Sequence, residues 1–190
     1  MQAKTQTTQM TLNGVDLEGL QALIRTADEQ PALAEAQWRA TNEWLDGPLN
    51  RTAMQGFFAA GAEDDSRQEA FLASADEPPV LLGENRGPNP VEYVLTALLG
   101  CLTTTLAYFA AAEGLELKSI RSRAEADMNV RGMFGLDPEV RNGFRDLRVS
   151  FEIESDEPRE RIEALMQTAR ERSVVLDIVA NPTPVSVELA

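Results

Sequence analysis

The chain has 190 residues, 43% of them hydrophobic and 25% charged, which suits one domain, or one domain with an appendage, that needs no disulfide or metal to bury a core. The formal net charge is −14, from 31 acidic and 17 basic residues. No Lys/Arg cluster offsets this charge, so nucleic acid is not an expected partner. No stretch approaches about 18 uninterrupted apolar residues, which predicts no membrane span. The polar N-terminus lacks the pattern of a signal peptide, and the predicted location is cytoplasmic.

Two absences narrow the possible chemistry. The chain has no His, which excludes Ser-His-Asp and Cys-His catalysis and removes the commonest ligand of transition metals. It has one Cys, so no intrachain disulfide and no zinc cluster of thiolates can form. We expect no cofactor and no metal. Any redox chemistry must therefore run through Cys101, alone or with an external thiol.

The N-terminal third divides into a helical segment and a group of strands. Residues 15–36 have apolar side chains at helical spacing after a possible cap at Asp16, with Pro31 as a break. We interpret residues 1–36 as an N-terminal helical extension and residues 37–190 as the main domain. Three strands of a meander are then predicted, at 37–45, 51–60 and 68–74. The Pro- and Gly-rich stretch 75–90 is predicted to be a loop.

The middle of the chain predicts a buried helix. Asn89-Pro90 opens it, because Pro is tolerated in the first turn, and Gly114 supplies the C-terminal stop. Residues 91–112 are apolar nearly all round, and a helix without a polar face lies in a core or an interface. Such a helix has more apolar surface than one sheet face covers, so we expect a second copy of the chain to cover the rest, as a homodimer.

The C-terminal half alternates strands and helices. Apolar and polar residues alternate along 120–130 and 147–154, which predicts an antiparallel hairpin with one buried face and a long loop at 132–143. Residues 158–172 carry a single apolar stripe and predict a second helix. After the apolar piece 173–179, Val185, Val187 and Leu189 predict a last strand. The fold class is therefore α+β, with an antiparallel sheet, two main helices, and the helix of Cys101 central and buried.

Residues 87–101 resemble the hallmark of the OsmC/Ohr family. In this family a Gly-rich loop, an Asn/Ser-Pro step and an acidic residue precede a buried helix with the reactive cysteine. Gly87-Pro88-Asn89-Pro90-Val91-Glu92-Tyr93 and Leu99-Gly100-Cys101 match this pattern. The resemblance implies a thiol peroxidase that reduces organic hydroperoxides at the interface of an intertwined dimer. It also implies that a second cysteine resolves the oxidised thiol and that an Arg and a Glu assist.

Carried over residue by residue, Cys101 matches the peroxidatic cysteine and Glu92 the acidic residue. The position of the resolving cysteine holds Ser173, and a hydroxyl cannot form the disulfide. The family's arginine corresponds to a position near Leu81, so Arg86 lies in the right loop at a different spacing. The candidate catalytic residues are therefore Cys101, Glu92, Arg86 and Ser173.

Each candidate also has a structural interpretation. A lone Cys in an apolar helix is usually a small buried hydrophobe. Glu92 lies in a first helical turn, where acid complements the helix dipole, and Ser173 can cap the segment that follows it. Two functions remain: a hydroperoxide reductase that uses an external thiol reductant, and a non-enzymatic dimer that binds a small apolar ligand at the subunit interface.

Overall fold

The computed structural model describes residues 10–189, which form two compact units. One comprises residue 10 and residues 16–94, and the other residues 11–15 and 95–189. The polar stretch 1–9, on which the argument about signal peptides rests, lies outside the described residues. The division between an extension and a main domain after residue 36 stays a prediction.

The first unit begins with a helix that is shorter than predicted. After the two-residue strands β1 (Thr11–Leu12) and β2 (Val15–Asp16), helix α1 spans Leu17–Glu29. Pro31 then opens a 3₁₀ turn, η1 (Pro31–Leu33). A proline ring forces the preceding residue out of the helical region, and Gln30 has φ −134° and ψ 74°. The helical interpretation of 15–36 is thus correct up to residue 29 and wrong beyond it.

Six strands in two antiparallel sheets make up most of the first unit. The sheets have the orders β4–β5–β8 and β3–β6–β7. The strand predicted at 51–60 is two strands, because the chain breaks at Gln55-Gly56. The bounds are β3 (Ala36–Gln37), β4 (Thr41–Asp46), β5 (Leu49–Met54), β6 (Phe57–Ala59), β7 (Ala62–Asp64) and β8 (Phe71–Ala75).

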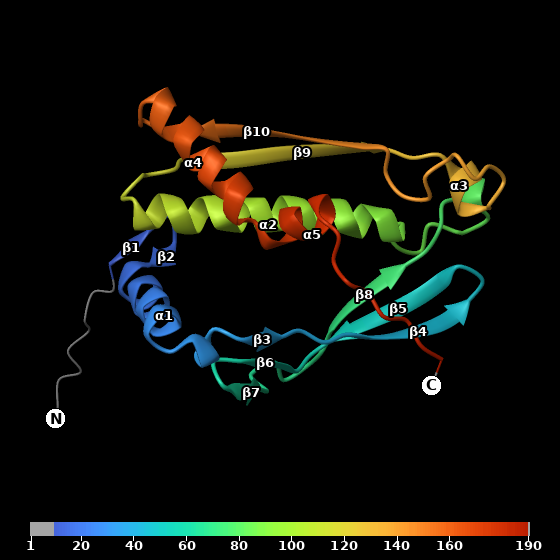
Figure 1. The fold of residues 1–190 in the computed structure, drawn as a ribbon, viewed down its shortest axis with the longest axis horizontal. Coiled ribbons are helices and arrows are strands. Elements are labelled where there is room, and N and C mark those ends of the chain that lie inside the picture. Colours follow the sequence, from blue (N-terminus) through green and yellow to red (C-terminus); the bar gives the residue numbers. More distant parts are fainter. Residues whose placement is uncertain (1–9, 190) are drawn as a thin grey trace. The chain divides into compact units, whose positions relative to one another are not determined.

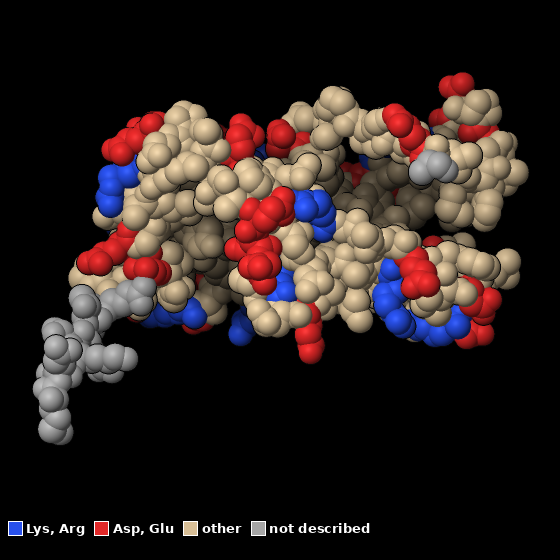
Figure 2. Space-filling model, turned by 90° about the horizontal axis from the view of Figure 1, so that it is seen from below, with Lys and Arg blue, Asp and Glu red and all other residues tan. Residues whose placement is uncertain are grey.

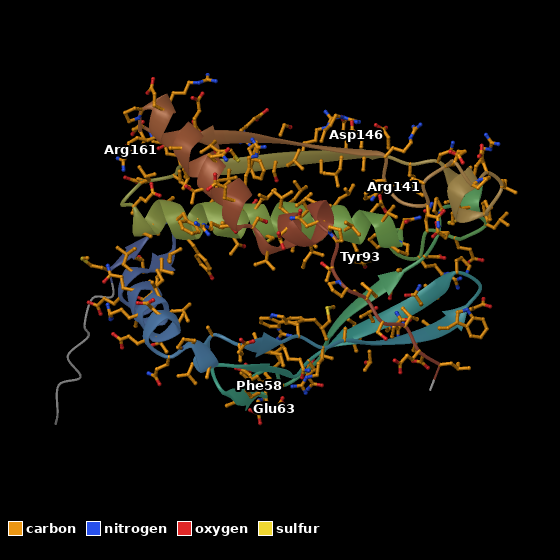
Figure 3. The ribbon with its side chains drawn as sticks, viewed as in Figure 1. Phe58, Glu63, Tyr93, Arg141, Asp146 and Arg161 are labelled. Atoms are coloured by element: carbon orange, nitrogen blue, oxygen red, sulfur yellow. The ribbon has the colours of Figure 1, made fainter. Side chains whose placement is uncertain are left out.

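The loop after β8 leads to the long helix that carries the cysteine. It contains a short 3₁₀ turn, η2 (Pro79–Leu81), and helix α2 then spans Pro90–Ala112. In the first turn of α2, where Figure 3 labels Tyr93, the Tyr93 hydroxyl donates a hydrogen bond of 2.7 Å to the carbonyl oxygen of Ser74 in β8. This bond fixes the start of the helix to the end of the strand.

Helix α2 is the core helix of the second unit, as predicted. Leu98, Leu102 and Leu106 are 0%, 3% and 0% exposed, and their spacing of four residues places them on one face. Leu106 and Ala110 pack with Leu165 and other buried residues into a hydrophobic cluster. By length and composition alone α2 is also apolar enough to cross a membrane, but core helices share this property.

An antiparallel hairpin and a second helix pack against that cluster, and Figure 1 shows both beside α2. Strands β9 (Ser119–Asp127) and β10 (Asp146–Glu154) pair over nine residues, with Ile120 opposite Ile153. Their apolar side chains and helix α4 (Arg159–Arg172) pack against the cluster. The strand predicted at 120–130 ends early, because Asn129 caps the one-turn helix α3 (Val130–Met133) in the loop. The structure confirms the α+β class and the antiparallel sheet.

The end of the chain differs from the prediction. The apolar piece after α4 is helix α5 (Val174–Ala180), and residues 182–189 then adopt no regular structure. Val185, Val187 and Leu189 are 80%, 90% and 103% exposed. The predicted last strand is therefore wrong for the single chain, because a strand requires a neighbour to accept its backbone hydrogen bonds.

Charged side chains of both signs are scattered over the surface. Figure 2 shows one face on which basic side chains are scattered among acidic ones, without a broad basic patch. Several of them pair, as Arg39 does with Glu63 and Lys118 with Asp156. Exposed pairs of this kind contribute little to stability.

Candidate active site around Cys101

The Cys101 side chain lies on α2 against the start of α5. It is half-buried and takes part in no disulfide. Its Sγ accepts a hydrogen bond of 3.3 Å from the Ser173 hydroxyl and one of 3.5 Å from the backbone N–H of Val175. The structure thus brings together two of the four candidate residues, which are 72 positions apart in the sequence.

The local structure explains why Ser173 reaches the sulfur. Helix α4 ends when the Ser173 N–H donates to Ala169 O at 3.0 Å. Ser173 then takes the extended backbone of an N-cap, and its Oγ accepts from Leu176 N at 3.3 Å. Because the Ser173 Oγ acts as the acceptor in the cap, its hydroxyl proton remains available to donate to the Cys101 sulfur. Ser173 is only 2% exposed, so the capping role and the contact with the thiol occur together.

The surroundings of Cys101 favour its thiolate. Burial raises the pKa of the thiol, but hydrogen bonds from the Ser173 hydroxyl and from the backbone N–H groups of Val175 and Val174 outweigh this, so the pKa lies below its usual value. These principal donors are neutral groups. Thr105, one turn along α2, donates its hydroxyl to the Cys101 carbonyl oxygen at 2.8 Å.

Glu92 has a capping role at the start of α2. Its Oε2 accepts a hydrogen bond of 2.8 Å from Asn89 N, while Asn89 Oδ1 accepts one of 2.9 Å from Val91 N. The Glu92 side chain thus satisfies the N–H of the cap residue, as in a capping box, while the Asn89 side chain caps the N–H of the second helical residue. The structural interpretation of Glu92 accounts for its position, nine residues before Cys101.

Arg86 is bound to a buried carboxylate in its own loop. Its Nε lies 3.2 Å from Oδ2 of Asp76 and 3.4 Å from Oε2 of Glu84. Asp76 is 1% exposed and also accepts from the backbone N–H groups of Glu77, Glu84 and Arg86 at 2.9, 3.2 and 3.0 Å. The Arg86 N–H bond is the main reason that the pKa of Asp76 is lowered to about 2, against the opposing effect of burial. Asp76 holds the loop in shape.

Sequence reasoning missed two groups, one in each unit. Asp76 is one acidic residue among many, and its role depends on backbone N–H groups that a sequence pattern does not reveal. The Val175 N–H is likewise a backbone group. The one feature of the sequence that could have indicated it is that Val175 follows Ser173, a possible N-cap. Over residues 10–189, no group of three or more His, Cys, Asp or Glu side chains could hold a metal ion.

The fold and the cysteine on its core helix define a class of protein. The sequence model of the OsmC-like proteins matches residues 83–188, more than half of the chain. The chain therefore belongs to the OsmC-like family. No curated protein sequence matches it.

Solved structures share the fold at low sequence identity. An OsmC-like protein from Mycoplasma pneumoniae superposes with a TM-score of 0.59 at 14% identity, over 76% of this chain and 87% of that one. An organic hydroperoxide resistance protein OsmC from Legionella pneumophila gives a TM-score of 0.51 at 15% identity, over 75% and 89% of the two chains. At such identities the likeness establishes the fold alone.

Proposed function

We propose that this protein is a thiol-dependent peroxidase that reduces organic hydroperoxides through Cys101. The observation that carries the proposal is the pair of hydrogen bonds to the Cys101 sulfur, from Ser173 Oγ at 3.3 Å and Val175 N at 3.5 Å. Donors aimed at the sulfur stabilise the thiolate, which is the nucleophilic form. Family membership and the name of the Legionella protein support the choice of substrate class.

The first half-reaction oxidises the cysteine by two electrons. The thiolate attacks the terminal oxygen of R–O–OH, the O–O bond breaks, and an S–O bond forms. The products are the sulfenic acid of Cys101 and an alkoxide, which takes a proton to become the alcohol ROH. The donors of Ser173 and Val175 can then bond to the sulfenic oxygen or sulfur.

The second half-reaction needs an external reductant, because Ser173 stands at the position of the resolving cysteine. A thiol R′SH attacks the sulfenic sulfur, releases water and leaves a mixed disulfide on Cys101. A second thiol attacks this disulfide, regenerates Cys101 and releases R′SSR′. Each cycle thus consumes one hydroperoxide and two thiols. A homodimer in the cytoplasm, where thiols are kept reduced, suits this chemistry.

A second function is favoured by the surroundings of Arg86. Its guanidinium is bound to Asp76 and Glu84, and the principal donors to the Cys101 sulfur are neutral. No cation is among those principal donors, and a non-enzymatic OsmC-like dimer, which would bind a small apolar ligand at its subunit interface, needs none.

Hydroperoxide consumption separates the two functions. Reduced protein is given cumene hydroperoxide with and without dithiothreitol, beside the variants Cys101→Ser and Thr104→Ser, the second a control at an exposed position of α2. The peroxidase proposal predicts continuous turnover only with dithiothreitol, in the wild type and Thr104→Ser. If the wild type consumes hydroperoxide no faster than Cys101→Ser, the ligand-binding function takes its place.

A further inference from the structure

A groove lies between strand β10 and helix α4, within the second unit. Its volume is about 430 Å³, inside the range of roughly 300–1,000 Å³ that is usual for small-molecule sites. At about 30 Å³ for a group the size of a water molecule, this volume holds a short aliphatic chain with a head group. Cys101 is not among the residues that line the groove, so it is a site apart from the thiol.

The floor of the groove is apolar. Phe151 and Ile153 line it from β10, and Ile162 and Met166 line it from α4. Phe151, Ile153 and Met166 also pack against the buried core cluster, so the fold itself holds these side chains in place. The floor is therefore ready to receive the apolar part of a ligand.

The charged residues of the groove are mostly acidic. They are Glu157, Arg159 and Glu163. Glu157 accepts a hydrogen bond of 2.8 Å from Arg161 through Oε2, and Glu163 accepts one of 2.7 Å from Arg159 through Oε1. Within residues 10–189 the second oxygen of each carboxylate accepts no hydrogen bond. Each carboxylate can thus accept one more donor.

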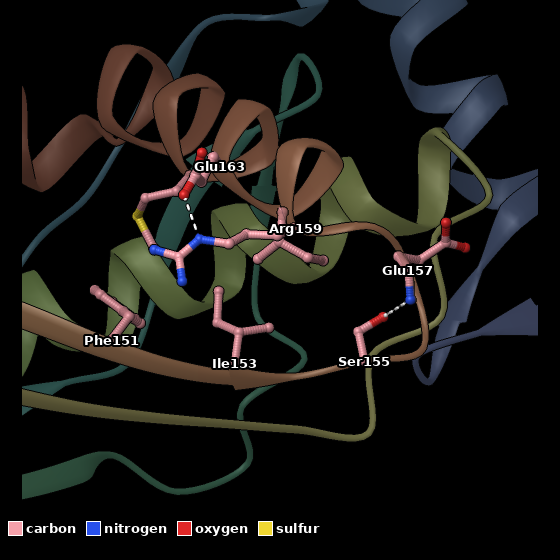
Figure 4. Close-up of a pocket in the computed structure, with 8 residues that line it drawn as sticks. Phe151, Ile153, Ser155, Glu157, Arg159 and Glu163 are labelled. Carbon is pink, nitrogen blue, oxygen red and sulfur yellow. Dashed lines mark hydrogen bonds and ion pairs between the residues drawn. The ribbon is translucent and has the colours of Figure 1, made fainter.

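Arg159 does not close the groove. Figure 4 shows its ion pair with Glu163 on the α4 side, across from Phe151 and Ile153 of β10. The Arg159 and Glu163 side chains are 87% and 61% exposed, and an exposed pair of this kind contributes little free energy. A ligand that offers a cation to Glu163 can therefore replace Arg159 at little cost.

We propose that this groove binds an organic cation, a molecule with an ammonium group on an aliphatic body. The aliphatic body would lie on the apolar floor, and the ammonium group would donate to the carboxylates of Glu157 and Glu163. A small number of polar groups beside an apolar wall is the usual composition of a small-molecule site.

Charge favours a cation over an anion as the ligand. A carboxylate would find one cation in the groove, Arg159, beside two acidic side chains. The chain as a whole has a net charge of −14, and a field of this sign attracts cations and repels anions. The same aliphatic body should thus bind better with an ammonium group than with a carboxylate.

Calorimetric titration of the full chain at pH 7 with octylammonium, 1-octanol and octanoate tests this order, because the three probes share one chain length and differ in the charge of the head group. Octylammonium should have a dissociation constant at least about tenfold below that of octanoate, with octanol between them. All three are used at concentrations below those at which they form micelles.

Two matched variants place the binding in the groove. Glu163→Gln should raise the dissociation constant of octylammonium several-fold and leave that of octanol unchanged. Glu160→Gln removes the same charge at an exposed position of α4 outside the groove, and it should bind octylammonium as the wild type does. Ile162→Trp fills the groove and should weaken all three probes, with circular dichroism to check the fold.

Three results would each overturn the proposal. They are octanoate that binds as tightly as octylammonium, equal losses in Glu163→Gln and Glu160→Gln, and no measurable binding of octylammonium. Unchanged binding in a folded Ile162→Trp would also overturn it, and if this variant does not fold, the two glutamate variants decide. No hydroperoxide is present in these titrations, so the outcome is independent of the proposed peroxidase activity.

Discussion

At the scale of single residues, the Ser173 hydroxyl is the side chain that most directly controls the Cys101 thiol. It donates to the sulfur at 3.3 Å and lowers the thiol pKa against the effect of burial. Ser173→Ala should therefore raise this pKa. Hydrogen bonds to charged groups are worth about 1.5–3 kcal/mol, so at a pH below the midpoint of the titration the thiolate fraction should fall about tenfold or more.

The pH dependence of alkylation by iodoacetamide measures this change. Only the thiolate reacts, so the midpoint of the rate profile should move to higher pH in Ser173→Ala and stay in place in the control Ser186→Ala. The variant also loses its N-cap, which costs about 1 kcal/mol, and circular dichroism checks that it remains folded. An unchanged midpoint would show that the hydroxyl does not stabilise the thiolate.

Ser173→Cys should allow an internal disulfide to form. The Oγ of Ser173 already contacts the Cys101 sulfur, and a cysteine differs from serine by one atom. Once hydroperoxide oxidises Cys101, the second thiol should condense with the sulfenic acid and release water. Mass spectrometry should find a product two mass units lighter than the reduced variant, and the matched variant Ser155→Cys should not form it.

At the scale of elements, the buried Asp76 carboxylate should make stability depend on pH. Its folded pKa is about 2, below the ordinary value of 3.8. A lowered folded pKa contributes stability above the unfolded value and loses it as the pH falls through the folded one. Asp76→Asn should therefore unfold at a lower temperature than the wild type near pH 7, and this difference should shrink between about pH 4 and pH 2.

Thermal unfolding across that range checks the prediction. Asp65→Asn, at an exposed position of the same unit, is the control and should follow the wild type. A difference between Asp76→Asn and the wild type that is the same at pH 2 and pH 7 would mean that the carboxylate charge does not hold the loop.

The core helix gives a prediction about packing. Leu106 is fully buried in the cluster that joins α2 and α4. Leu106→Ala should lower the free energy of unfolding by about 2–5 kcal/mol, through lost burial and the cavity left behind. Denaturant titration measures this loss of free energy of unfolding. The control is Tyr108→Ala, two residues further along α2 at an exposed position, which should cost less. Equal losses would place Leu106 outside the core.

At the scale of the whole molecule, the sequence predicted the elements whose apolar residues are periodic. The burial of Leu98, Leu102 and Leu106, the β9–β10 hairpin and helix α4 all follow from spacing alone. The division of 51–60 into two strands did not, because it depends on which strand each half pairs with. The C-terminal strand was predicted from its alternation and is wrong for one chain, which has no neighbour to pair with it.

The candidate site was less predictable than the fold. Ser173 was chosen through family resemblance, since nothing in its spacing indicates a contact with Cys101. The partners of Arg86 and Glu92 are local groups, whose geometry depends on how the loop and the first turn of α2 close. Backbone N–H groups such as that of Val175 carry no side-chain signal at all. Long-range contacts and backbone donors therefore required the structure.

The central claim is that Cys101 is a thiolate that hydroperoxides oxidise. Its most direct test is to treat reduced protein with one equivalent of cumene hydroperoxide in the presence of dimedone, and then to locate the adduct by peptide mass spectrometry. The account predicts a dimedone adduct on the peptide of Cys101, formed at a rate that rises with pH until the thiol is fully ionised. If Cys101 is still unmodified after the full equivalent of hydroperoxide has been added, the claim that hydroperoxides oxidise this thiolate is contradicted.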